Sequence, residues 1–162
     1  MSVPSNLGPL YQIEGLVTNG GAFPGNRPPM LKFASEDSSA QGPFGVTMAT
    51  PIDVKVEDEV LLDVWITDDG LPGKFSSLYV RSLQGGQRQQ RYGRNLSVAW
   101  SKYRGSGTVL FDDPSPLVED DRARTTVTFT EPGEYMLRVL ASDGSGFNGC
   151  CWTNGYVKAT VE

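Results

Sequence analysis

The residues best suited to binding chemistry form one basic stretch in the middle of the chain. Residues 71–94 contain five cations and no acid, interleaved with tyrosine and glutamine. Guanidinium groups pair with carboxylates and phosphates, and tyrosine adds rigid apolar contact area. The residues expected to bind a partner here are Tyr79, Arg81, Arg88, Arg91, Tyr92 and Arg94. The stretch predicts a docking loop for an acidic protein face or for anionic lipid headgroups; a solvated hairpin extension that shields a sheet edge is the alternative.

Charge is distributed unevenly along the chain. The net charge is −5 and residues 71–94 carry +5, which leaves −10 for the remainder. An acidic remainder repels phosphates, so we expect no nucleic-acid partner. The asymmetry itself bears on which protein or lipid surfaces the chain can approach.

Several catalytic arrangements are excluded because the chain contains no histidine. Its absence removes the usual general base near neutral pH, the Ser–His–Asp and Cys–His arrangements and the zinc sites that contain histidine. Cys150 and Cys151 are adjacent, which offers too few ligands for zinc and lacks the C-x-x-C spacing of redox sites. We expect two free thiols there, no catalytic residue, no cofactor and no enzymatic activity.

Aspartates in the expected loops are the candidate metal ligands. Calcium needs several hard oxygen ligands, and loops at one end of a sandwich can gather them. No EF-hand spacing is present, and an aspartate in a turn often accepts a hydrogen bond from its own backbone instead. The calcium candidates are Asp68, Asp69, Asp112, Asp113 and Asp143.

Trp152 is the other candidate binding residue. Its glycine- and asparagine-rich flanks, residues 148–155, predict a loop near the end of the chain. A tryptophan in such a loop either caps one end of the core or stacks on a sugar or a protein partner.

Short strands joined by tight turns must position these residues. Glycine (19) and proline (11) are frequent, and no window shows sustained apolar residues at helical spacing. Alternation at period two is clearest at residues 59–67, 95–102 and in the closing hairpin, residues 130–162. Further strands are expected at 30–33, 107–111 and 124–130 and weakly within 46–56, with a polar loop at 35–45. The hairpin has an apolar face that needs an opposing sheet, so the fold class is all-β.

Three segments together resemble a known family: residues 96–111 with Trp100, residues 123–130, and the Pro-Gly-x-Tyr run within residues 131–144. They resemble the PKD-like immunoglobulin-type domains of bacterial multidomain proteins, and Asp68-Asp-Gly-Leu-Pro72 fits the turn before the central tryptophan strand. The resemblance implies an antiparallel β-sandwich of about seven strands. It also implies a role as a spacer, an adhesion unit or a module that contacts proteins or sugars.

The core and the domain limits follow from the same reading. Trp100 is expected between the sheets against Leu62, Val64, Leu137 and Val139, and Tyr135 is expected to form a tyrosine corner. Residues 1–25 are predicted to be an extended arm, and residues 26–162 the sandwich. A basic insertion at 75–94 is long for this family.

The sequence supports two alternative cellular locations. The N-terminus shows no signal peptide and no apolar run reaches the roughly 20 residues of a membrane span. If Met1 is the true start, we expect the cytoplasm or a membrane surface; the family resemblance implies an extracytoplasmic location instead.

The predicted function is that of a non-catalytic structural or interaction module. We expect an accessory subunit that braces a larger protein assembly through its arm and its Arg-rich loop. The alternative is a carbohydrate-binding or adhesion domain that uses Trp152.

Overall fold

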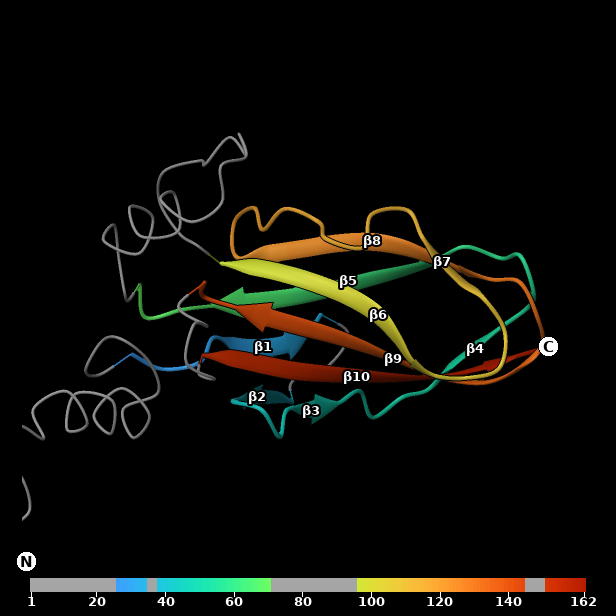
Figure 1. Ribbon diagram of the computed structural model, residues 1–162, viewed down its shortest axis with the longest axis horizontal. Coiled ribbons are helices and arrows are strands. Elements are labelled where there is room, and N and C mark those ends of the chain that lie inside the picture. The colour runs from blue at the N-terminus through green and yellow to red at the C-terminus, as the bar shows by residue number, and fades with distance from the viewer. Residues whose placement is uncertain (1–25, 35–37, 71–95, 145–150) are drawn as a thin grey trace, which may run out of the picture.

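The computed structural model describes residues 26–34, 38–70, 96–144 and 151–162, which form two facing β-sheets (Figure 1). The predicted arm and the basic insertion lie outside the described residues, and so do six of the predicted partner-binding residues. Within the described residues there are ten strands and no helix. The strands are β1 (Met30–Phe33), β2 (Ser39–Gln41), β3 (Val46–Thr47), β4 (Ile52–Val54), β5 (Val60–Thr67), β6 (Ser97–Arg104), β7 (Val109–Phe111), β8 (Arg122–Phe129), β9 (Gly133–Ser142) and β10 (Trp152–Val161).

The first sheet has the order β2-β1-β5-β8-β7, and the second has the order β3-β10-β9-β6, with β4 also paired to β10. The long strands of both sheets run along the long axis of the sandwich in Figure 1. The all-β sandwich of two sheets predicted from the sequence is therefore confirmed.

The strand inventory differs from the prediction in its short members. β2 lies inside the predicted polar loop, and β2, β3 and β4 raise the number above seven. β3 and β4 pair with β10 in parallel, so the second sheet is mixed rather than purely antiparallel. β2, β3 and β4 have only two or three residues each, too few to show an alternating pattern, and for that reason the sequence did not predict them clearly.

The core lies between the sheets and contains the residues that the alternation selects. Trp100 is 4% exposed, and its ring stacks on Phe111 of β7 with centroids 6.5 Å apart. The other predicted core residues are also buried in the same cluster: Leu62, Val64, Tyr135, Leu137 and Val139. Gly155 in β10 leaves room for the opposite sheet, because a Cβ there would come within 3.0 Å of Leu31, Phe33 and Val139.

The predicted tyrosine corner is present at the start of β9. The Tyr135 hydroxyl donates a hydrogen bond of 2.8 Å to the carbonyl oxygen of Glu131. Two glycines make space for the ring: a Cβ on Gly105 would lie 2.3 Å from Tyr135 Cδ1, and one on Gly107 would lie 2.1 Å from the hydroxyl. The turn before β9 is thereby tied to the turn before β7.

The expectation of two free thiols is wrong for Cys151. This residue is 1% exposed and disulfide-bonded, and the only other cysteine in the sequence is Cys150, outside the described residues. Cys151 has a φ of 75°, in the left-handed region that non-glycine residues rarely adopt. The expectation of free thiols rested on the strained ring that a disulfide between adjacent cysteines forms.

Candidate interaction surface

The outer face of the first sheet carries large side chains that the core does not use. Along β5, Leu62, Val64 and Ile66 point inward, so the side chains between them point outward. Of these, Leu61 is 59% exposed and Trp65 is 38% exposed.

Exposed apolar side chains concentrate on this side of the molecule. Seven large ones are exposed among the described residues, and five belong to the first sheet or to the loop after β7. These five are Met30, Leu61, Trp65, Leu110 and Leu117. The remaining two, Phe44 and Tyr103, lie elsewhere. Clustering of this kind marks a contact surface more often than scattered single residues do.

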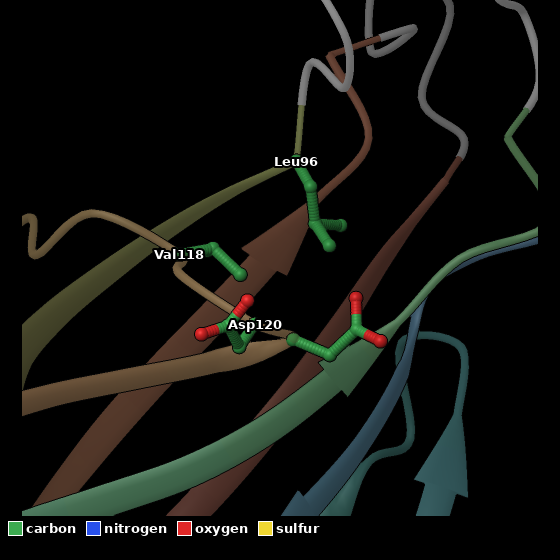
Figure 2. A pocket seen from close by; sticks show the side chains of 4 residues that line it. Leu96, Val118 and Asp120 are labelled. Atoms are coloured by element: carbon green, nitrogen blue, oxygen red, sulfur yellow. The ribbon is translucent and has the colours of Figure 1, made fainter.

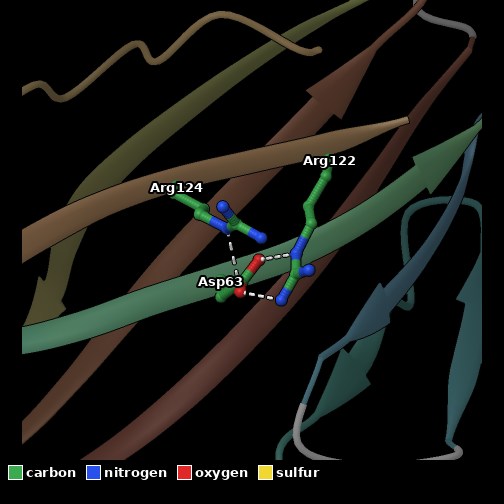
Figure 3. Close-up of polar contacts among 3 residues, drawn as sticks. All are labelled: Asp63, Arg122 and Arg124. Carbon is green, nitrogen blue, oxygen red and sulfur yellow. Dashed lines mark hydrogen bonds and ion pairs between the residues drawn. The ribbon is translucent and has the colours of Figure 1, made fainter. Parts of the chain in front are cut away.

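Asp63, Arg122 and Arg124 form an ion-pair network (Figure 3). The network lies beside Trp65 on the same face. Strand register places Trp65 opposite Arg122 and Asp63 opposite Arg124. Arg122 Nε donates to Asp63 Oδ1 at 2.7 Å, its Nη2 pairs with Oδ2, and Arg124 Nε donates to Oδ2 at 3.2 Å. One carboxylate thus orients two guanidinium groups, and the pair with Arg122 has the bidentate geometry that gives directional binding.

Arg122 also lies over the Trp65 ring. Its Cζ is 4.7 Å from the ring centroid, within cation–π range. The hydrogen bond to Asp63 raises the pKa of Arg122 above its ordinary value, so this cation persists at every physiological pH. The indole and the guanidinium are therefore held together before any partner arrives.

A groove of about 620 Å³ separates this face from the loop that follows β7. Trp65, Arg122 and Arg124 form the wall that belongs to the sheet. The loop wall is formed mainly by carboxylates and two apolar residues: Asp112, Asp113, Pro116, Leu117, Glu119 and Asp120. The groove therefore combines an aromatic ring, two arginines and an acidic wall.

The loop wall is tied to both sheets by backbone hydrogen bonds. Asp112 N–H donates to Thr126 O at 3.1 Å, and the Pro114 carbonyl accepts from Trp100 N–H at 2.7 Å. Asp113 Oδ1 accepts from Ser115 N–H at 2.8 Å, which fixes the turn locally. These bonds give the groove a defined width.

A tight turn before β8 sets the position of Arg122. Glu119 and Arg122 bond to each other through both backbone groups, and Asp120 and Asp121 between them have φ values of 50° and 60°. Two positive φ values are typical of a type I′ turn. Both aspartates, with Leu96 and Val118, line a second hollow of about 360 Å³ at this end of the sheets (Figure 2).

The calcium candidates divide between two places. Asp68 lies close enough to Asp69 and Asp143 for mutual repulsion. Asp112 and Asp113 instead line the groove, away from that group. Within the described ranges, no three Asp, Glu, Cys or His side chains form a group that could hold a metal ion. Calcium binding at these residues stays a prediction.

The fold raises the pKa of the Asp68 carboxyl group. Burial raises its pKa above the ordinary 3.8, the hydrogen bond from Gly70 N–H opposes this, and the nearby Asp69 and Asp143 raise it again. Asp68 Oδ1 is buried and has no hydrogen-bond partner among the described residues. Ionised Asp68 therefore weakens the folded state.

Trp152 is part of a strand rather than a loop. It is the first residue of β10, is partly buried, and pairs with Ser142 of β9. Neither its predicted contact with a partner nor the sugar alternative is tested by this position. The remaining predicted partner-binding residues, Tyr79, Arg81, Arg88, Arg91, Tyr92 and Arg94, lie outside the described ranges.

Sequence reasoning missed the outer-face residues as a site, although part of the signal was present. The alternation in residues 59–67 already placed Leu61, Asp63 and Trp65 on one side of a strand. Arg122 and Arg124 were divided between a predicted loop and a predicted strand start, so their register opposite Trp65 and Asp63 was not visible. The signal that could have predicted this site was a tryptophan on the polar side of an alternating strand.

Comparisons with known proteins give distant structural neighbours only. No family model matches the chain, and no curated protein matches it. One similar solved structure is a nucleoside hydrolase-related hypothetical protein from Saccharophagus degradans, described as associated with carbohydrate metabolism. It is 13% identical with a TM-score of 0.49, over 85% of this chain and 26% of that chain. The chain thus spans about a quarter of that protein.

Two further neighbours are also remote. A conjugative transposon lipoprotein from Bacteroides eggerthii is 12% identical with a TM-score of 0.40, over 81% of this chain and 93% of that one. A PKD domain is 18% identical with a TM-score of 0.35, over 80% of this chain and 94% of that one. The described part of the chain contains no helix able to cross a membrane.

Proposed function

We propose that this chain is a non-catalytic interaction module that binds a protein partner through the outer face of its first sheet. The observation that carries the proposal is that five of the seven large apolar side chains exposed among the described residues lie on the first sheet or in the loop after β7, and that one of them, Trp65, is held by Arg122. Tryptophan and arginine are the residue types most enriched at the energetic centres of protein interfaces.

The charges suggest what kind of protein surface would fit. Asp63 already pairs with Arg122 and Arg124, whereas the opposite wall of the groove carries Asp112, Asp113, Glu119 and Asp120. A partner with an apolar centre and a basic rim would complement the ring and the acidic wall together. Such a partner would be a larger protein that the sandwich braces as an accessory subunit.

The N-terminal arm and the Arg-rich segment are proposed as additional contacts. Their composition supports this, because apolar residues in the arm and arginines in the insertion suit docking. Contact of the Arg-rich segment with anionic headgroups at a membrane surface belongs to the same proposal. These contacts would add to the outer-face interface and are not needed for it.

The experiment compares two aromatic–arginine pairs on the same protein. Tyr103 is 48% exposed on β6 and lies under Arg104, whose Cζ is 5.4 Å from the ring centroid. Trp65→Ala and the matched control Tyr103→Ala would each be expressed as the full chain in the cells that make it. The size of the native complex would then be measured by gel filtration.

We expect the unaltered chain and Tyr103→Ala to elute in a large complex, and Trp65→Ala to elute alone. An unaltered chain that elutes as a lone monomer would reject the proposal. So would a Trp65→Ala variant that stays in the complex as fully as the control does.

A further inference from the structure

The outer face of the second sheet carries aromatic and cationic side chains that neither the core nor the groove uses. Leu137 of β9 and Val157 of β10 point into the core, so the side chains before and after them point outward. Strand register places Tyr156 beside Arg138 on this outward side, and Lys158 beside the outward residue that precedes Arg138 by two. We call the group that gathers here the second-sheet face; it consists of Tyr103, Arg104, Met136, Arg138, Tyr156 and Lys158.

A β-bulge in β6 supplies two members of this face. The register between β6 and β9 shifts between Lys102 and Arg104, so Tyr103 is the extra residue of the bulge. Consecutive residues of a regular strand point to opposite faces, but the bulge brings Arg104 Cζ within 5.4 Å of the ring centroid of Tyr103. The Tyr103 ring reaches across β9 to the ring of Tyr156 on β10, with centroids 5.5 Å apart and planes inclined at 60°. Two aromatic rings and a cation are thus assembled on one surface.

Arg138 is oriented by a neighbour but has no carboxylate partner. Its Nε donates to Asn154 Oδ1 at 3.0 Å, and Asn154 Nδ2 donates to the Pro43 carbonyl oxygen at 2.6 Å. Asn154 is only 7% exposed, so this acceptor is itself fixed. Within the described ranges, no carboxylate forms an ion pair with Arg138, Arg104 or Lys158. The terminal nitrogens of Arg138 can therefore pair with an incoming anion from a defined direction.

The positive charge of the second-sheet face is confined, which argues against a lipid surface. Glu134 of β9 and Asp53 of β4 both lie opposite Thr160, two residues beyond Lys158 on the same outward side. Anionic lipid surfaces are bound by clusters of roughly four to eight cations. The second-sheet face has fewer cations than that, and its two neighbouring carboxylates would meet the headgroups as well.

The backbone of the sheet argues against an acidic peptide. The strands of this sheet bond their N–H and C=O groups to one another, so a peptide lying across them would find no backbone partner. A sugar chain needs none, because its rings offer apolar C–H faces to aromatic side chains and its acid groups pair with guanidinium groups. Its charge is also sparser than that of a nucleic acid, which the acidic remainder of the chain repels.

We propose that the second-sheet face binds an acidic polysaccharide that carries a uronate carboxylate on every second sugar. The carboxylate pairs with the terminal nitrogens of Arg138, and a neighbouring sugar packs on the Tyr103 ring, which is 48% exposed. Arg104 on β6 and Lys158 on β10 add positive charge on either side of this pair. The inference does not depend on the proposed protein-binding function, because that function uses the other sheet.

Isothermal titration calorimetry of the purified full chain with hyaluronan oligosaccharides tests the proposal. Hyaluronan carries a carboxylate on every second sugar, and its methyl ester has the same sugars without the charge. We expect saturable binding of hyaluronan, and binding of the methyl ester that is weaker by about tenfold or more, because the pair between arginine and carboxylate is lost. No saturable binding of hyaluronan, or an equal affinity for the ester, would overturn the proposal.

Three variants locate the binding on the molecule. Arg138→Met keeps an apolar stem without the charge and should weaken hyaluronan binding by about tenfold or more. Tyr103→Ala removes a largely exposed ring, so the fold persists, and should weaken binding about three- to tenfold. Lys32→Met removes one positive charge on β1 of the first sheet and should leave the affinity unchanged. An affinity that is unchanged in both Arg138→Met and Tyr103→Ala, or that falls equally in Lys32→Met, would place the binding elsewhere and overturn the proposal.

Competing ligands are tested with the same variants. Poly-L-glutamate and vesicles of phosphatidylserine should bind more weakly than hyaluronan, and Arg138→Met should change their affinity less than it changes that of hyaluronan. Tighter binding of either competitor that Arg138→Met abolishes would also overturn the proposal, because it would assign the second-sheet face to an acidic protein or to a lipid surface.

Discussion

Arg122 covers the ring of Trp65 at 4.7 Å while its Nε donates a 2.7 Å hydrogen bond to Asp63. The guanidinium is thus fixed on two sides, by a carboxylate in its plane and by an indole beneath it. Ordering long side chains in advance lowers the entropy that a partner must offset on binding. For this reason the outer face of the first sheet is a better docking surface than an equal area of mobile charged residues.

The stability of the sandwich should depend on Trp100 and not on Trp65. Trp100→Ala removes a ring that is 4% exposed and stacked on Phe111, so we expect a loss of ~3–5 kcal/mol in the free energy of unfolding. Trp65→Ala, at a ring that is 38% exposed, should lose about 1 kcal/mol or less. Urea denaturation of both variants makes the comparison; equal losses would show that the core is not centred on Trp100.

The tyrosine corner gives a second, smaller effect. Tyr135→Phe removes only the hydroxyl that donates to Glu131 O at 2.8 Å, and should lower stability by about 0.5–1.5 kcal/mol. Tyr103→Phe serves as the control because that residue is 48% exposed. Thermal unfolding of both variants would decide the point, and no difference between them would mean that the corner does not contribute.

A substitution of Gly107 tests the packing around Tyr135 in the same tyrosine corner. Gly107→Ala would place a Cβ 2.1 Å from the Tyr135 hydroxyl and 2.8 Å from Glu131 Cβ. We expect it to destabilise the fold by more than Tyr135→Phe does, roughly 1–3 kcal/mol, because the ring must move. Gly42→Ala is the control, since a Cβ there meets nothing within 4 Å and only its φ of 96° is unfavourable. A larger loss for Gly42→Ala would argue against the packing explanation.

Asp68 should make stability depend on pH in the acidic range. Its pKa is raised in the fold, mainly by burial, so the folded state binds the proton more tightly than the unfolded chain does. Its unfavourable contribution is present above the raised pKa and disappears as the pH falls through that value to the ordinary 3.8. Asp68→Asn should therefore be more stable than the unaltered chain at about pH 7, with a difference that shrinks towards about pH 4.

Denaturation curves at both pH values check this dependence. The hydrogen bond that Gly70 N–H makes to the Asp68 side chain at 2.9 Å can persist in Asp68→Asn, because the amide oxygen is still an acceptor. Asp53→Asn, at an exposed position on β4, controls for the general loss of one negative charge. A benefit of Asp68→Asn that is the same at both pH values would contradict a raised pKa.

Alternating strands were the part of the fold that could be predicted from the sequence. Leu62, Val64, Leu137 and Val139 repeat at period two, and Trp100 continues the same alternation in its own strand, so both the facing sheets and the core followed. The tyrosine corner followed from the position of Tyr135 after a turn. These features depend on residues that are close together in the sequence, so the sequence alone predicts them.

The candidate interaction surface could not be predicted, because it depends on the register between neighbouring strands, which the local sequence does not reveal. Arg122 meets Trp65 only because β8 pairs with β5, a strand far back in the chain, and because the turn at Asp120–Asp121 sets where β8 begins. The bulge at Tyr103 and the contact between the rings of Tyr103 and Tyr156 are likewise products of tertiary packing. A run of arginines, in contrast, is visible in the sequence alone, and the predicted contact was therefore placed in the Arg-rich segment.

Site-directed photo-cross-linking tests the central claim most directly. A benzophenone amino acid would replace Leu61 on the outer face of the first sheet, and in a parallel chain Lys158, which is exposed on β10 of the second sheet. Position 61 should form a covalent adduct with one defined protein in the producing cells, and Arg122→Glu should abolish that adduct. Adducts from position 158 alone, or an adduct from position 61 that survives Arg122→Glu, would contradict the account.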